Sequence, residues 1–157
     1  MVAEAVQQEA RALAMTGESF TAVAEKLDQA RLLLDQAADG GSSSLGAHYS
    51  PTLLDLQSAI CYVEAGRPGL AVGIYRAHLD AGRLSKRDRG YFSVLMGQAL
   101  VAAHEPDEAA HLGQRALDVA VATRSARTIG ELSRLAQQLK AWKTRPAVRE
   151  LCDALAA

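Results

Sequence analysis

The six residues Gly66-Arg67-Pro68-Gly69-Leu70-Ala71 end one helical pattern and begin the next, and their spacing recurs along the chain. Gly66 closes a helix, and Pro68 suits the first turn of the following one. An alanine follows the closing residue at the same distance in two other places, Gly17 to Ala22 and His104 to Ala109. Twelve residues before the three alanines stand further small residues, namely Ala10, Ala59 and Gly97. Such repeats predict stacked helix pairs, which form binding surfaces more often than active sites.

The composition favours helices throughout. Hydrophobic residues make up 49% of the 157 residues but aromatic residues only 4%, and the four prolines and twelve glycines fall largely between periodic segments. The length suits one domain with a sizeable core. No apolar run approaches the length of a membrane span, and acids stand where a signal peptide would have bases. We therefore expect a cytoplasmic protein that does not enter a membrane.

Eight helices in four pairs are predicted, with no strand. The expected ranges are about 2–15, 18–38, 51–65, 68–81, 86–103, 106–122 and 125–141, and a short last helix begins at Arg145-Pro146. Residues 39–50 are rich in Gly and Ser and predict a flexible loop inserted between the first two pairs. We thus expect a single helical-repeat domain over residues 1–157, with the pair at about 125–157 as its C-terminal cap.

The second pair resembles a tetratricopeptide repeat. Ala59, Tyr62, Ala71 and Tyr75 have the small–aromatic–small–aromatic spacing of that family. The third pair resembles it through Gly97, Leu100, Ala109, Ala116 and Leu117. The early tryptophan of the motif is missing, and Arg83 replaces its closing proline. The resemblance implies an all-α fold, a right-handed superhelix of about four antiparallel helix pairs.

A narrower resemblance concerns residues 139–151, which include Trp142 and the Arg145-Pro146 helix start. This segment looks like the closing part of the helical-repeat regions of actinobacterial helix-turn-helix transcriptional regulators. In those proteins a DNA-binding domain precedes a sensor or oligomerisation region of the tetratricopeptide type. No helix-turn-helix is recognisable in this chain, so the resemblance implies either the C-terminal region of a regulator or a standalone relative.

Motifs of catalysis and of metal or cofactor binding are not found. The sequence has no glycine-rich phosphate loop, no His-Glu-x-x-His, no Cys-x-x-Cys and no nucleophile elbow. Its four histidines are scattered, and Cys61 and Cys152 lie in apolar helical contexts that indicate buried thiols. We expect no catalytic residues, no metal site and no cofactor.

Charge is unevenly distributed although the net charge is only −1. Residues 1–39 carry three Lys/Arg against seven Asp/Glu, and residues 124–157 carry seven Lys/Arg against three acids. Differently solvated helix faces explain this, with a basic docking face for an acidic partner or a phosphate backbone as the alternative. The link Arg83–Arg89 holds four basic residues and one acid, and we interpret it as a solvated loop.

A ligand of such a repeat domain is expected on the groove formed by the first helix of each pair. The small residues must point at their partner helices, which fixes the rotation of each first helix and places eight residues on the groove. They are Gln7 and Arg11 in the first pair, Leu56, Ile60 and Glu64 in the second, and Tyr91, Val94 and Gln98 in the third. Such a mixture suits a peptide, an amphipathic helix or a lipophilic small molecule, unless the 39–49 loop or another subunit fills the groove.

These observations predict a binding module for a protein, a peptide or a small signalling molecule, and not an enzyme. The second resemblance implies the regulatory part of a transcriptional regulator, with no direct nucleic-acid binding by this region. A homodimerisation scaffold or adaptor without a small ligand is the alternative. A third hypothesis, nucleic-acid binding through the basic C-terminal third, predicts steep salt dependence.

Overall fold

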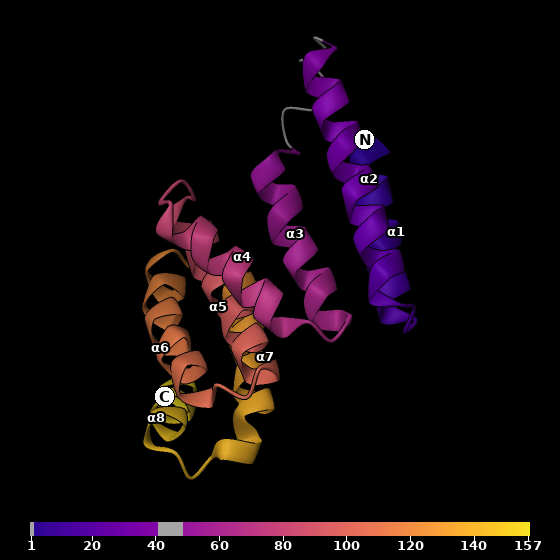
Figure 1. Cartoon of the computed structure of the whole chain (residues 1–157). Coiled ribbons are helices and arrows are strands. Elements are labelled where there is room, and N and C mark those ends of the chain that lie inside the picture. Colours follow the sequence, from indigo (N-terminus) through magenta and orange to yellow (C-terminus); the bar gives the residue numbers. More distant parts are fainter. Residues whose placement is uncertain (1, 41–48) are drawn as a thin grey trace. The chain divides into compact units, whose positions relative to one another are not determined.

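The computed structural model describes residues 2–40 and 49–157, which form eight α-helices, one 3-10 helix and no strand (Figure 1). The all-α prediction is therefore confirmed for these residues. The helices are α1 (Val2–Met15), α2 (Phe20–Asp39), α3 (Pro51–Glu64), α4 (Pro68–Asp80), α5 (Lys86–Ala102), α6 (Pro106–Ala122), α7 (Ala126–Gln138), η1 (Leu139–Trp142) and α8 (Pro146–Ala156). Within the described part of the chain, no helix is both long and apolar enough for a membrane span.

Contacts divide the chain into two compact units, Met1–Ile74 (unit 1) and Tyr75–Ala157 (unit 2), and the boundary falls inside α4. Each unit is described by itself. The expectation of one continuous domain stays a prediction. Most of the predicted inserted loop, residues 41–48, lies outside the described residues. The remaining loop positions flank it at the end of α2 and before α3.

Unit 1 is built on the pair α1 and α2, with α3 packed against both. Many of its buried apolar side chains gather in two clusters. One joins Ala3, Val6, Ala30, Leu34, Tyr49 and Leu54, and the other joins Ala10, Ala14, Val23, Leu27 and Cys61. Each cluster takes side chains from α1 and α2, and each is completed by a residue of α3. The amphipathic stripes of consecutive helices thus close on a third helix.

Unit 2 is built on the pair α5 and α6. α7 packs against both helices, and α8 packs against α6 and α7. Its core contains several leucines that are fully buried, namely Leu132, Leu135, Leu139 and Leu151. The segment 125–141, predicted as one helix, is α-helical to Gln138 and continues as the 3-10 helix η1. The tighter last turn is a common way for an α-helix to end.

The closing residues that mark the repeats all adopt the left-handed conformation. Gly17, Gly66 and His104 have φ of 79°, 75° and 63°, and Arg124 has φ of 50°. At Gly66 the amide of the next residue donates to the Tyr62 carbonyl over 2.7 Å, and the Gly66 amide donates to the Val63 carbonyl. The same two bonds recur at the other three positions. This Schellman geometry satisfies the last carbonyls of α1, α3, α5 and α6.

Helix starts are fixed by hydroxyls and prolines in the same regular way. The hydroxyls of Ser50 and Ser125 cap α3 and α7 and accept hydrogen bonds from the amides of Leu53 and Thr128. Pro51, which follows Ser50, is the first residue of its helix, as are Pro68, Pro106 and Pro146. Because start and stop are both encoded locally, six of the seven bounded predictions agree with the helices within about two residues at each end.

Most small residues of the repeat are buried, although Ala22 is half-buried. Ala10, Ala59, Ala71 and Ala109 are fully buried. A Cβ placed on Gly97 would lie 3.1 Å from Leu135 Cδ2 on α7 and 3.5 Å from the Ala109 carbonyl on the partner helix α6. Gly97 therefore faces its partner, as expected.

We expect Gly66→Ala to lower the free energy of unfolding by about 1 kcal/mol, because alanine is strained at positive φ. The site has open space around it, so sterics do not add to this cost. Gly73→Ala is the matched control, since Gly73 lies inside α4, also in open space and without positive φ. It should raise stability by about 0.5–1 kcal/mol through helix propensity. Urea unfolding measures the stability of both variants. Equal effects would contradict the left-handed conformation of Gly66.

A second pair of variants tests the packing of α6. A Cβ on Gly113 would lie 2.7 Å from Leu151 Cδ2 and 3.1 Å from Leu135 Cδ2, and both leucines are fully buried. Gly130 on α7 has nothing within 4 Å. We expect the free energy of unfolding to be about 1–3 kcal/mol lower for Gly113→Ala than for Gly130→Ala, because overpacking outweighs the gain in helix propensity. Urea unfolding measures this difference. If the two variants were equally stable, the leucines around Gly113 could move to accept a methyl group without loss of stability, and the prediction would be wrong.

Candidate functional site

The predicted groove residues of unit 1 are mostly engaged within the unit. Gln7 is 1% exposed, and its amide nitrogen lies 3.6 Å from Cys61 Sγ on α3. Leu56 is buried and Ile60 half-buried. Arg11 Nη2 lies 3.4 Å from Glu64 Oε1. This ion pair joins α1 to α3, the first helices of the first two predicted pairs.

The three predicted residues of unit 2 are engaged in the same way. Val94 is fully buried. The Arg127 guanidinium carbon lies 3.7 Å above the centre of the Tyr91 ring, which is a cation–π contact. Gln98 donates to the Glu131 carbonyl over 3.3 Å and to its carboxylate over 2.9 Å. This second bridge joins α5 to α7.

The two polar bridges occupy matching places in the repeat. Arg11 and Gln98 each follow the small residue of a first helix, Ala10 or Gly97, and each reaches a glutamate on the next first helix. Arg11 keeps spare capacity, because its buried Nε has no hydrogen-bond partner among the described residues. Whether all eight residues line one groove stays a prediction, since they are divided between the two units.

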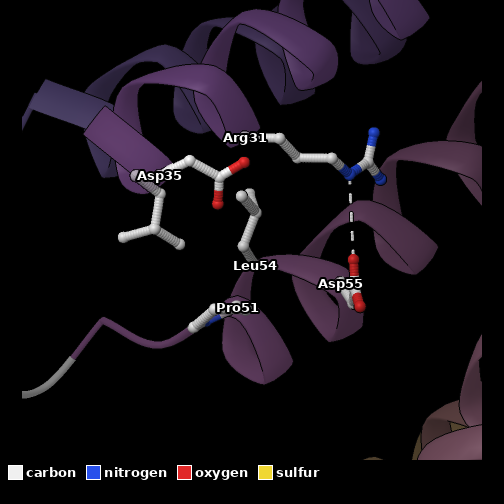
Figure 2. A pocket seen from close by; sticks show the side chains of 6 residues that line it. Arg31, Asp35, Pro51, Leu54 and Asp55 are labelled. Carbon is white, nitrogen blue, oxygen red and sulfur yellow. Dashed lines mark ion pairs between the residues drawn. The ribbon is translucent and has the colours of Figure 1, made fainter. Parts of the chain in front are cut away.

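Unit 1 has a small pocket of about 130 Å³ between α2 and α3, lined by Arg31, Leu34, Asp35, Pro51, Leu54 and Asp55. Figure 2 shows Arg31 and Asp55 pointing toward one another, with Nε and Oδ1 3.8 Å apart. Arg31 also pairs with Asp28 over 2.8 Å. Burial lowers the pKa of Arg31, but hydrogen bonds to the Tyr62 and Asp28 side chains and the charge of Asp55 raise it above its usual value. The guanidinium is therefore already compensated from within the chain.

Unit 2 has a larger pocket of about 300 Å³ between the end of α4, the start of α5 and α6, which we call the arginine pocket. Its lining residues are Arg76, Leu79, Asp80, Arg89, Ser93, Met96, Glu108, Leu112 and Arg115. Met96 and Leu112 are buried and form an apolar base, whereas the three arginines are exposed. Arg76 and Glu108 form an ion pair of 2.7 Å.

Charge in the arginine pocket is not balanced. Three guanidinium groups face two carboxylates, and one carboxylate is held by Arg76. Arg89 and Arg115 have no ion pair within residues 2–40 and 49–157. Arginine always carries its charge and presents a fork of donors that suits carboxylates. The pocket can therefore bind an anionic group next to apolar surface.

Sequence reasoning missed this pocket. Arg76, Arg89 and Arg115 stand on three different helices, and the intervals between them follow no helical period. Only Arg89 belongs to a feature that the sequence singled out, the basic link Arg83–Arg89. The sequence analysis interprets that link as a solvated loop, and its last residues, which the predicted helix 86–103 already includes, lie in the first turn of α5. No sequence signal placed Arg76 or Arg115 beside it.

The arginine pocket has few side chains that could act as nucleophiles or as general acids and bases. Ser93 is the one hydroxyl in the arginine pocket, and no histidine or cysteine lines it. Residues that would hold a metal do not gather elsewhere either, since the part of the chain that the structure describes has no group of three or more His, Cys, Asp or Glu. What the pocket offers is recognition of charge and apolar surface.

Comparison with known proteins gives no relative: no family model, no curated protein and no solved structure matches the chain.

The Gln7–Cys61 contact leads to a prediction on thiol reactivity. Burial raises the pKa of the Cys61 thiol to about 11, although the hydrogen bond from Gln7 lowers it. At pH near 8 its thiolate should be about 100-fold scarcer than that of an ordinary cysteine. We expect Ellman's reagent to modify Cys152, which is half-buried, far faster than Cys61. The variant Cys152→Ser should show only the slow phase, and denaturant should remove the difference; two fast phases in the native chain would contradict this environment.

Proposed function

We propose that this chain is a helical-repeat interaction module that binds a protein or peptide partner, with the arginine pocket of unit 2 as its main contact site. The observation that carries the proposal is the pocket itself. It joins two arginines, Arg89 and Arg115, that have no ion pair among the described residues to a buried apolar base, and it has no histidine or cysteine among its lining residues. Such a lining favours binding over catalysis.

The repeated architecture supports the same proposal. Four matching Schellman turns and two matching bridges between first helices are what a chain of similar helix pairs would have. Helical repeats commonly present side chains of successive helices to one extended ligand. We further propose that the pairs form a right-handed superhelix of the tetratricopeptide type. The resemblance of residues 139–151 favours a role within a transcriptional regulator in the cytoplasm.

The proposal is tested by selection from a displayed peptide library on the immobilised full chain. We expect peptides with a common motif to be enriched and to bind the chain in solution. If the predicted groove is part of the binding surface, Arg11→Ala and Gln98→Ala should bind those peptides more weakly. Circular dichroism checks that both variants are folded. Unchanged affinity in both variants would remove the groove from the site and leave the arginine pocket.

Failure to enrich any peptide would contradict the proposed function. Light scattering at several concentrations then examines the alternative. A chain without peptide ligands that dimerises would be a scaffold, whereas a strictly monomeric chain would exclude that function. The exposed large apolar side chains, Val2, Met15, Leu32, Leu70 and Val121, are distributed over four helices. This scatter is common on monomers and does not favour the scaffold.

A further inference from the structure

The partner's chemistry can be inferred from how the charges of the arginine pocket are arranged. Of the two acids in the lining, Glu108 is held by Arg76 over 2.7 Å. Asp80 is exposed at the end of α4. Two exposed arginines, Arg89 and Arg115, remain to attract a ligand that brings negative charge. The excess of positive charge comes from residues on three helices and not from one flexible segment.

The acid closest in sequence to Arg89 is kept away from it by a helix cap. Asp88 lies in the basic link, but its carboxylate accepts a hydrogen bond of 2.7 Å from the Ser85 hydroxyl. The Ser85 hydroxyl in turn accepts from the Asp88 amide over 3.1 Å. This reciprocal arrangement starts α5 and engages the only acid of the link. Arg83, Lys86 and Arg87 add three more positive charges to the same segment.

Arg89 itself is directed toward the turn that precedes α5. A Cβ on Gly82 would lie 3.6 Å from Arg89 Nη2. Gly82 has φ of 68°, a conformation that glycine adopts without strain. The guanidinium therefore folds back along the α4–α5 turn at the edge of the pocket. It stands there without a carboxylate partner among the described residues.

Apolar surface beside the arginines indicates a ligand that carries apolar groups as well as negative charge. Met96 is 4% exposed and Leu112 8% exposed, and both line the pocket together with half-buried Leu79. A phosphate backbone would want aromatic platforms or a wide basic surface, and no aromatic side chain lines this pocket. The volume of about 300 Å³ stands at the lower limit for small-molecule sites and suits a few side chains of a larger partner.

We infer that the arginine pocket binds an acidic segment of a partner protein, which places a carboxylate between Arg89 and Arg115 and an apolar side chain on Met96 and Leu112. This inference rests on the proposed function and specifies its partner by charge. Opposite charge across the interface would speed association and exclude basic or neutral segments. The desolvated apolar contact would add affinity that salt does not screen.

The test compares two fluorescent peptides on the full chain by anisotropy. One repeats Asp-Glu-Leu, and the other replaces both acids by their amides. We expect the acidic peptide to bind at least about tenfold more tightly, with affinity that falls as salt is added. Equal affinity for both peptides would overturn the inference.

Variants of the pocket supply the second arm. The double variant Arg89→Gln/Arg115→Gln should weaken binding of the acidic peptide by about tenfold or more, since it removes the charge of both charge-assisted hydrogen-bond donors. Arg149→Gln is the control, because Arg149 is exposed on α8 and does not line the pocket. Both should keep the circular dichroism of the parent chain. Unchanged binding in the double variant overturns the inference.

The outcomes also separate this inference from the proposed function. Inorganic phosphate or a single-stranded oligonucleotide is added as competitor to the bound acidic peptide. Displacement at lower concentration than unlabelled acidic peptide would indicate a phosphate site and overturn the inference. Library selection that enriches neutral or basic peptides would overturn it too, while the proposed function stands. Only the absence of any peptide ligand removes both.

Discussion

The structure depends on one backbone constraint, the left-handed residue that ends a helix and turns the chain toward the next. Gly17, Gly66, His104 and Arg124 all meet it with the same pair of backbone hydrogen bonds. Where the direction of the turn is fixed, the following helix begins within a few residues, and a buried alanine such as Ala109 then allows α5 and α6 to approach closely. The arrangement of each pair thus follows from local geometry before any large side chain packs.

Two of these four residues carry a side chain, which costs about 1 kcal/mol or more in the left-handed region. His104 has a compensating contact, because its ring lies 6.4 Å from that of Trp142 in an edge arrangement. Arg124 is exposed and has no such contact among those described. Packing of α5, α6 and α7 therefore overrides local preference at these turns. The four turns share one backbone conformation although their residue types differ.

Element boundaries could be predicted because their signals are local. Pro51, Pro106 and Pro146 each stand at the first helical position, and serine hydroxyls cap α3 and α7. The site could not be predicted in this way. Arg76, Arg89 and Arg115 meet only through packing, and Gln7 is buried where α3 packs on α1, with its amide nitrogen 3.6 Å from Cys61 Sγ. The positions of small residues in the sequence predict the rotation of a helix, but they do not reveal which distant residues its other side chains contact.

Leu135 has a consequence for how this chain can vary. Its Cδ2 lies 3.1 Å from the Cβ position of Gly97 on α5 and also 3.1 Å from that of Gly113 on α6. One leucine therefore fills the space left by two glycines on different helices. A methyl group added at either glycine pushes the same side chain, so the energetic effects at the two positions are coupled and do not add. In relatives of this chain, the residues at these three positions are expected to change together.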